Sequence, residues 1–386
     1  MNIKSLVNPN SWKNMIRRSL WYICRLIPVS KNKVVAMSYT GRGYCDNPKY
    51  IVEELLRQDL PCQIYWVVKN PSIDNHLPSG IRPIKLESLQ YVYHMTTARL
   101  WIDNCRKFFY GKRPGQFYIQ TWHGGHGLKK IEGACLDALE PEYINCAKHD
   151  SEMSDLFLSN SGLLTDLYLR DFWYSGPVME EGLPRNDIFF QEDFDRRAVR
   201  RALKIPQGKK VMLYAPTFRA DHSLEPYLLD CKKCALALKE RFGGDWVVLY
   251  RLHPNIFEMS DQLHYDPEYA INASDYFDIQ EIYTIADAIM TDYSSVILDF
   301  MITKKPSFLF ATDIDKYCGD RGFALSLDEL PFPLATGNDE LEQLIRSFDT
   351  DRFEREVDAF MARTRVHETG HASRSAVEWI REHVHA

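Results

Sequence analysis

The sequence predicts an α/β protein of two doubly wound domains, each organised around a parallel sheet. The length of 386 residues suits two domains at roughly 100–200 residues each. Short runs rich in β-branched and aromatic residues alternate with segments of helical periodicity in both halves of the chain. The hydrophobic share of 45% and the charged share of 26% are those of an ordinary folded protein, which excludes disorder and fibrous repeats.

Five runs in the first half of the chain are expected to form buried strands. Between the first two, Pro48 stands at the first turn of a predicted helix with apolar residues over 50–56, because a proline is tolerated there. This strand, helix and strand form the unit from which parallel sheets are built. The predicted strands cover residues 33–38, 63–68, 100–103, 117–122 and 156–159.

The second half repeats the alternation and is expected to form a sheet of its own. A stretch with glycine and proline at 176–189 marks the boundary, and a charged helix at 192–203 follows it. The simplest architecture that fits this pattern is two Rossmann-like domains that face one cleft. The last predicted helix, at 373–384, could fold back across the boundary. Strands are predicted at 211–215, 246–251, 288–291 and 307–310, and a helix at 295–303.

The amino-terminal end is locally basic, since residues 1–33 carry seven lysine or arginine residues and no acidic residue. Its apolar stretch at 20–29 is interrupted by an arginine and a proline and is shorter than the roughly 20 residues that span a membrane. No signal-peptide cleavage site follows it, so the protein is expected to stay inside the cell. The segment either lies on an anionic inner-leaflet surface or packs on its own domain. The segment is predicted to form a basic amphipathic helix, because helical spacing separates its apolar residues Trp12, Ile16, Leu20, Ile23 and Ile27.

The overall composition limits which partners the protein can bind and which cellular compartment it occupies. With 47 basic and 53 acidic residues the net charge is −6, which excludes a general nucleic-acid binder. The nine cysteines have no framework spacing, which predicts reduced thiols in the cytoplasm. Cys231 and Cys234 have the spacing of a metal or redox pair, but no second pair or histidine lies nearby in sequence, so no zinc site is expected there.

The residues that point to chemistry follow the predicted strands directly, where open parallel sheets bind their ligands. His123 stands at the end of the strand at 117–122, where it would act as a general base, since an imidazole with its ordinary pKa near 6.5 accepts a proton close to neutral pH. The alternative is a structural histidine beside a glycine turn. Glycines let a substrate approach the backbone, and lysines add positive charge. Both follow in the run Gly124, Gly125, His126, Gly127, Leu128, Lys129 and Lys130.

Two strand ends in the second half present hydroxyl and cationic side chains. Thr217 and Arg219 follow the first strand of that half, and Arg251 and His253 end the next. The planar guanidinium of arginine suits phosphate because it can bind two oxygens at once. The alternatives are a surface salt bridge for Arg219 and a capped turn for His253.

The strand at 288–291 leads into an apolar helix through Asp292, Ser294 and Ser295. The N–H groups at the start of a helix, with two serine hydroxyls added, would form an anion site that fits a phosphate. The alternative is that one serine merely caps the helix. Asp299, one turn further on, would hold a ribose hydroxyl or simply bond the loop.

One pattern points to a different chemistry. Residues 367–371 read HETGH, which matches the metalloprotease pattern whose two histidines must share one helical face. Gly370 weakens such a helix, and Ser373 has the character of a cap for the final helix. We therefore expect a loop-to-helix junction at this place and no zinc protease.

Taken together, these motifs resemble the CDP-glycerol glycerophosphotransferase family, the primases and polymerases of teichoic acids and related phosphopolyol polymers. The matches keep the family order over roughly residues 30–385. The family commonly has Thr-Pro after Trp-His-Gly, whereas residues 125–127 replace it here, which makes His126 an extra acceptor contact or a second candidate base. The matching strings are NPKY (47–50), TWHG (121–124), GLPRND (182–187), YAPTFR (214–219), RLHP (251–254), TDYSS (291–295) and RGF (321–323).

The resemblance implies a GT-B-like pair of domains on the cytoplasmic face of the cell membrane. No tightly bound cofactor and no metal site are expected, although a divalent ion on the phosphates stays open. The implied segments are a basic membrane-associating helix at 1–30, an acceptor-binding domain at 31–180, a nucleotide-binding domain at 181–365, and a carboxyl-terminal helix at 366–386.

The resemblance also implies a reaction, the transfer of glycerol phosphate or a related polyol phosphate from CDP-glycerol to an acceptor hydroxyl, with release of CMP. The acceptor would be membrane-linked or a growing polymer. His123 would be the base for that hydroxyl, and His253, the second catalytic candidate, would bind the diphosphate. The candidate substrate-binding residues are Gly124, Gly125, His126, Lys129, Arg185, Thr217, Arg219, Arg251, Asp292, Ser294, Ser295 and Asp299.

Two alternatives stay open at this point. A GT-B glycosyltransferase would move a sugar and release a nucleoside diphosphate instead of CMP. A non-catalytic nucleotide-binding membrane scaffold would keep the fold alone. The choices between glycerol and ribitol and between primase and polymerase also stay open, and we expect no counterpart of the additional amino-terminal domain of larger polymerases.

Overall fold

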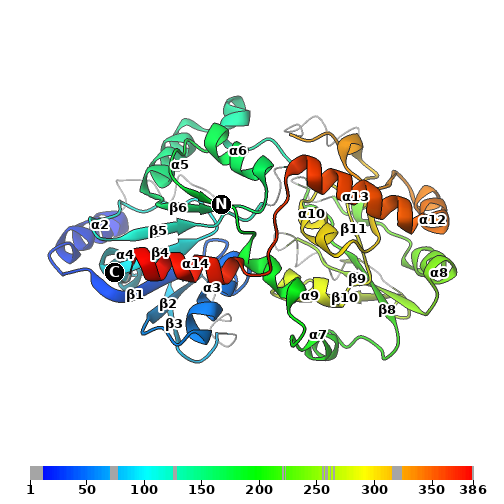
Figure 1. Ribbon diagram of the computed structural model, residues 1–386, viewed down its shortest axis with the longest axis horizontal. Helices are drawn as coiled ribbons and strands as arrows, with labels where there is room; N and C mark the ends of the chain where they lie inside the picture. Colours follow the sequence, from blue (N-terminus) through cyan, green and yellow to red (C-terminus); the bar gives the residue numbers. More distant parts are fainter. Residues whose placement is uncertain are drawn as a thin grey trace. The chain divides into compact units, whose positions relative to one another are not determined.

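Two parallel β-sheets organise the chain, and each sheet lies in its own unit (Figure 1). The first unit comprises Met1–His123, Ile131–Asp187 and His367–Ala386, and the second comprises Gly124–Lys130 and Ile188–Val366. The predicted α/β class with two parallel sheets is confirmed. The structure, a computed structural model, describes residues 12–69, 77–124, 128–219, 221, 223–253, 256, 260, 262–263, 266–314 and 324–384.

Seven strands form the sheet of the first unit in the order β3-β2-β1-β4-β5-β6-β7, and all neighbouring pairs are parallel. The strand order reverses between β1 and β4, so the topological switch point of this sheet lies there. The strands are β1 (Ser30–Met37), β2 (Gln63–Val68), β3 (Ile81–Lys85), β4 (Ala98–Asp103), β5 (Phe117–Gln120), β6 (Leu156–Leu158) and β7 (Val178–Met179).

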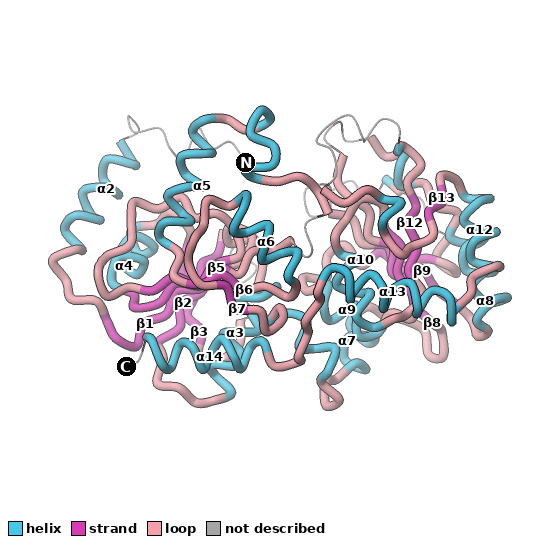
Figure 2. The backbone as a smooth tube through the Cα atoms, turned by 45° about the horizontal axis from the view of Figure 1, so that its top comes forward, coloured by secondary structure: helices cyan, strands magenta, loops and turns pink. Residues whose placement is uncertain are grey.

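Both faces of this sheet are covered, because alternate residues of each strand point to opposite faces. In β1, Val34 and Ala36 join the cluster that includes α3 and α14, whereas Val35 and Met37 join the cluster that includes α2 and α4. Figure 1 shows α14 (red) beside α3, and Figure 2 shows α2 beside α4. The helices are α2 (Trp12–Cys24), α3 (Asp46–Arg57), α4 (Leu89–Thr97), α5 (Pro141–Met153), α6 (Gly162–Asp171) and α14 (Ala372–His383).

Two carboxylates fasten the carboxyl-terminal segment to the first unit. Asp187 accepts hydrogen bonds from the backbone N–H groups of the first two residues of α14, at 2.9 and 2.7 Å, which caps this helix. Glu368 accepts from the side-chain amides of Asn160 (2.7 Å) and Asn186 (2.6 Å). Residues 367–371 therefore form a loop that leads into α14. Among the residues that the structure describes, no group of three His, Cys, Asp or Glu side chains is placed to hold a metal ion.

Helix α2 buries one side and exposes another. Trp21 packs into the cluster between α2, α4 and the sheet. The side chains of Trp12, Met15 and Ile23 are 67%, 60% and 60% exposed. No helix in the described part of the chain is both long enough and apolar enough to span a membrane.

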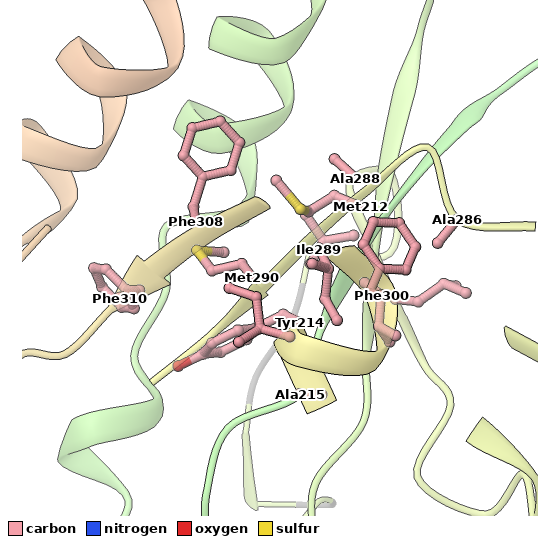
Figure 3. Packing of buried hydrophobic residues seen from close by; sticks show 14 of the residues in the cluster. Met212, Tyr214, Ala215, Ala286, Ala288, Ile289, Met290, Phe300, Phe308 and Phe310 are labelled. Carbon is pink, nitrogen blue, oxygen red and sulfur yellow. The ribbon is translucent and has the colours of Figure 1, made fainter. Parts of the chain in front are cut away.

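Six parallel strands form the sheet of the second unit in the order β10-β9-β8-β11-β12-β13, and its switch point lies between β8 and β11. One continuous hydrophobic cluster fills this unit; Figure 3 shows Tyr214 of β8, Met290 of β11 and Phe308 of β12 within it. The strands are β8 (Lys210–Tyr214), β9 (Trp246–Tyr250), β10 (Ala270–Asn272), β11 (Ala288–Thr291), β12 (Ser307–Phe310) and β13 (Leu334–Ala335). The helices are α7 (Arg196–Ala202), α8 (Cys231–Phe242), α9 (Ile279–Ile285), α10 (Val296–Phe300), α12 (Asn338–Arg346) and α13 (Thr350–Thr364).

Candidate active site

Polar and titratable residues follow the strands near the switch point of each sheet. In the first unit, Tyr39 follows β1, Asn104 follows β4 and His123 follows β5. In the second unit, Thr217 follows β8 and Asp292 follows β11. Open parallel sheets bind their ligands at this place. Each unit thus presents one candidate binding edge.

His123 follows a backbone turn in a rare conformation. Trp122 has a φ of +52°, in the left-handed region that costs a non-glycine residue about 1–3 kcal/mol. This turn ends β5 at Gln120, not at residue 122 as the sequence predicts. Such a turn persists only where its surroundings hold it, and turns of this kind cluster at functional sites.

The imidazole of His123 is held in one tautomer. Its Nδ1 lies 2.6 Å from the carbonyl oxygen of Asn104, which can only accept, so Nδ1 carries the proton and Nε2 is the proton acceptor. Burial lowers the pKa of His123 below its usual value, against the opposing effects of that hydrogen bond and of Asp46. The rings of Tyr39 and Trp122 lie 5.5 and 4.5 Å from the imidazole between centroids. The arrangement provides a neutral base near neutral pH.

Arg185, a predicted substrate-binding residue, lies beside His123 but contacts acceptors of the protein itself. Its side chain is buried, and Nη1 is ion-paired with Asp46 at 3.1 Å. The same nitrogen donates to the carbonyl oxygen of His123 at 2.9 Å. These contacts hold the backbone of His123, which is a positioning role.

A buried ionic network fixes the loop that carries Asn104. Arg106, two residues further on, pairs with Asp150 at 3.1 Å and with Glu132 at 3.4 Å. All three side chains are almost fully buried. A buried charge is tolerated only when it is paired and hydrogen-bonded, as it is here. The network therefore stabilises the loop whose carbonyl orients His123.

Asp292 is the centre of the candidate edge in the second unit. Its buried carboxylate accepts from the backbone N–H of Thr217 at 2.8 Å and from the hydroxyl of Thr217 at 2.5 Å. It also pairs with Nη2 of Arg219 at 2.8 Å. The structure thus brings three predicted residues together, as partners of one another.

Arg219 is surrounded by acceptors of the protein. Its Nε and Nη2 atoms donate to the carboxylate of Asp313 at 2.7 and 2.9 Å, and Nη1 donates to the carbonyl oxygen of Thr217 at 2.6 Å. Burial opposes its charge, but hydrogen bonds to Asp313 and Asp292 outweigh burial and raise the pKa of Arg219. The sequence left open a phosphate contact or a surface salt bridge for this residue, and in the structure its ion pairs with Asp292 and Asp313 are buried.

The residues around α10 differ in their exposure. Ser294 and Ser295 are partly exposed, and the side chain of Ser295 makes no capping bond to the helix. The hydroxyl of Ser294 accepts from a backbone N–H two residues further on, at 3.4 Å. Asp299 is buried and accepts from the side-chain amide of Gln280 at 3.4 Å. The serines are accessible to a ligand, whereas Asp299 bonds within the fold.

Arg251 and His253 follow β9, which pairs with β8. Nη2 of Arg251 makes long hydrogen bonds of 3.3 Å to the carbonyl oxygens of Tyr276 and Phe277. Its Nε is buried and has no hydrogen-bond partner among the described residues. Such an N–H is a donor that a ligand oxygen can satisfy. His253 is exposed, and its ring centroid lies 5.9 Å from that of Phe218.

The run after His123 is described in part. Gly124 is half-buried, and Lys129 is half-buried next to Leu128, whose carbonyl oxygen accepts from the N–H of Ala324 at 3.0 Å. These residues group with the second unit. Outside the described residues lie Gly125, His126 and the RGF string at 321–323.

Asp46, at the start of α3, and three residues that follow strands at the two edges are absent from the sequence predictions. Tyr39, Asn104 and Asp313 each contact a predicted residue. Each stands within three positions of the end of a predicted strand, at 33–38, 100–103 or 307–310. A systematic survey of polar residues behind every strand would have found these three.

The chain matches a known protein family over most of its length. The family described as CDP-Glycerol:Poly(glycerophosphate) glycerophosphotransferase matches residues 20–382. The teichoic acid poly(glycerol phosphate) polymerase of Staphylococcus epidermidis is 32% identical over 394 residues, covering 93% of this chain and 54% of the relative. The teichoic acid glycerol-phosphate transferase of Staphylococcus aureus is 32% identical over 358 residues, covering 88% of this chain and 90% of the relative. The chain thus spans about half the length of the first protein and most of the second.

Solved structures show the same fold. A variant of the wall teichoic acid polymerase TagF, soaked with CDPG, matches with a TM-score of 0.84 and 30% identity, covering 96% of this chain and 93% of that chain. MnaA of S. aureus, solved with UDP, matches at 14% identity with a TM-score of 0.52, covering 91% of this chain and 96% of that chain, a likeness of fold alone. The predicted GT-B-like fold class is confirmed by these likenesses. On the match over residues 20–382, the chain belongs to the CDP-glycerol:poly(glycerophosphate) glycerophosphotransferase family.

Proposed function

We propose that the protein transfers glycerol phosphate from CDP-glycerol to a hydroxyl group of a phosphopolyol or membrane-linked acceptor, and releases CMP. Membership of the family supports the reaction class, and the TagF structure soaked with CDPG supports the donor. The observation that carries the proposal is the imidazole of His123, which is neutral, fixed in one tautomer and placed at a switch point.

The chemistry is a phosphoryl transfer in which His123 acts as the general base. The acceptor oxygen bonds to the phosphorus that bears glycerol while the phosphoanhydride bond to CMP breaks. Nε2 takes the hydroxyl proton, and the electron pair of the broken bond leaves with CMP. Asp46, which favours the charged form of His123, stabilises the imidazolium that results.

The second unit is the proposed donor side. Arg251 supports this assignment because its buried Nε has no partner among the described residues and can donate to a diphosphate oxygen. His253 and the hydroxyls of Ser294 and Ser295 are accessible and are proposed as further donor contacts. Arg219 is proposed as a positioning residue, because protein carboxylates occupy its guanidinium.

Helix α2 is the proposed contact with the cytoplasmic face of the membrane. Its exposed Trp12, Met15 and Ile23 share one helical face, since they are spaced by three, eight and eleven positions. Lys13 and Arg18 are exposed as well. An apolar face flanked by basic residues is typical of helices that lie on anionic lipid surfaces. This contact would bring a lipid-linked acceptor to the protein.

Product analysis tests the proposed reaction. The purified protein is incubated with CDP-glycerol, CDP-ribitol or UDP-sugars together with a polyol-phosphate acceptor, and the released nucleotide is identified. We expect CMP, in an amount equal to the polyol phosphate added to the acceptor. Release of CDP or UDP would contradict phosphoryl transfer and favour a glycosyltransferase, and CMP release without growth of the acceptor would indicate hydrolysis.

A further inference from the structure

We propose that Asn47 is a positioning residue that holds the strained turn before His123. The inference rests on the proposed function, since it concerns the base of that reaction. The side-chain amide of Asn47, at the start of α3, donates to the carbonyl oxygens of Trp122 at 3.2 Å and Thr121 at 3.4 Å. These two carbonyl groups belong to the peptide groups on either side of Trp122, the residue with a φ of +52°.

The other end of the same side chain reaches a second segment. Oδ1 of Asn47 accepts from the backbone N–H of Arg185 at 3.1 Å. The guanidinium of Arg185 in turn donates to the carbonyl oxygen of His123 at 2.9 Å. Asn47 is fully buried, so water does not compete for these bonds. One amide thus connects the peptide groups on both sides of His123 to one support.

Asp46 completes this arrangement, which we name the 46–47 clamp. Asp46 has a φ of +61°, and its carboxylate accepts from the backbone N–H of Asn47 at 2.6 Å. It also accepts from Nη1 of Arg185 at 3.1 and 3.2 Å and from the hydroxyl of Tyr39. The clamp therefore has its own fixed geometry, independent of any ligand.

The clamp determines how the imidazole is presented. Without the amide of Asn47, Trp122 can relax to a negative φ, which moves Nδ1 of His123 away from the carbonyl oxygen of Asn104. The base then loses its fixed tautomer and part of its burial. The fixed tautomer and the burial both determine how the proton-accepting Nε2 of His123 is placed. A shift of about 1 Å in a catalytic group reduces turnover about 10²-fold.

The ionisation of His123 reports this change directly. Burial is the largest influence on its pKa, so a displaced imidazole returns upwards towards the ordinary value of about 6.5. Substitution of Asn47 removes no charge from the surroundings. Among the described residues, the titratable and charged groups that face the imidazole are Tyr39, Asp46, Cys105, Glu132 and Arg185.

The experiment compares Asn47→Ala and Asn47→Leu with a matched control, Asn160→Ala. Asn160 is another buried asparagine of the first unit, but its amide donates to Glu368. Asn47→Leu nearly keeps the volume of the side chain, adds no charge, and removes both the donor to Trp122 and the acceptor for the Arg185 N–H. Steady-state kinetics with CDP-glycerol, thermal unfolding and NMR titration of the His123 ring are measured for each protein.

We expect both Asn47 variants to lose about 10²-fold in kcat, with the KM for CDP-glycerol within about twofold of the original, and to titrate His123 at a higher pH. Asn160→Ala loses stability only. If the Asn47 variants lose stability as the control does, but keep kcat and the His123 titration, the positioning role is wrong. Should the original protein not use CDP-glycerol, the proposed function fails, while the NMR titration still decides the role of Asn47.

Discussion

Nδ1 of His123 lies 2.6 Å from the carbonyl oxygen of Asn104, although the two residues follow different strands of the first sheet. A backbone carbonyl neither ionises nor depends on the identity of its side chain. The tautomer of the proposed base is therefore fixed by the path of the chain, which leaves Nε2 as the atom of His123 that can accept a proton.

Removal of the base should separate turnover from donor binding. His123→Ala should lower kcat by roughly 10²–10⁴-fold, the usual contribution of general-base catalysis. Affinity for CDP-glycerol, measured by calorimetry, should stay the same because the proposed donor contacts lie in the second unit. His149→Ala removes a partly exposed histidine of the same unit and serves as the control. Unchanged turnover in His123→Ala would remove the base assignment.

The pH dependence of kcat/KM should follow the ionisation of His123. Burial lowers its pKa from the ordinary value of about 6.5. The base works only when it is deprotonated, so the rate should be constant at neutral pH and fall as the pH drops through that lowered pKa. A rate profile between about pH 4.5 and 8 measures the position of this acid limb. A midpoint above 6.5 would contradict a buried neutral base.

The donor side can be tested at Arg251. Arg251→Gln should raise the KM for CDP-glycerol by roughly 10–100-fold, because a charge-assisted hydrogen bond to phosphate contributes about 1.5–3 kcal/mol. Arg241→Gln is the matched control, since Arg241 of α8 also donates to a carbonyl oxygen, that of Phe348 at 2.7 Å. Equal KM values for the two variants would exclude a donor contact by Arg251.

Removal of the cation from the buried network beside Asn104 should destabilise the first unit. Arg106→Leu leaves Asp150 and Glu132 buried without their cation, and breaking a buried ion pair in this way costs about 3–5 kcal/mol. Urea unfolding followed by fluorescence measures this loss. The control is Arg352→Leu, whose exposed pair with Glu356 should contribute nothing measurable. Equal stability of the two variants would show that the network is dispensable.

Membrane contact by α2 can be tested with vesicles. Changing Met15 and Ile23 to glutamate places charge on the exposed apolar face and should abolish sedimentation with vesicles that contain anionic lipid. The original protein should bind these vesicles more weakly as salt increases. Leu236→Glu, on an exposed apolar residue of α8, is the control and should bind as the original does. Binding by the α2 variant would refute the assignment.

Hydrophobic periodicity predicts much of this fold because buried parallel strands are continuous apolar runs. The predicted bounds of β2, β11 and β12 agree with the structure. Strand β3 was missed because it contains Pro83 and polar residues, which are tolerated since β3 pairs with β2 alone and forms an edge. The helix predicted at 295–303 is an α-helix only at Val296–Phe300 and continues as a 3₁₀ turn.

The position of the candidate residues was predictable, but their partners were not. Strand ends identify His123 and Thr217, because ligands of parallel sheets bind there. The partners are residues far apart in the chain. Arg219 pairs with Asp313, and Asn47 donates to the turn at Trp122. Local patterns in the amino-acid sequence carry no information about such distant pairs.

Helix α14 covers the same face of the first sheet as α3, with Ala376, Val377 and Ile380 in that cluster. During synthesis on a ribosome, the strands of this sheet emerge long before α14 does. The part of their apolar face that α14 covers stays open until residues 372–383 have been made, and residues 188–366 have all been made before then. The sheet that is synthesised first is therefore covered only after the second unit has been made, and until then the nascent chain exposes apolar surface there.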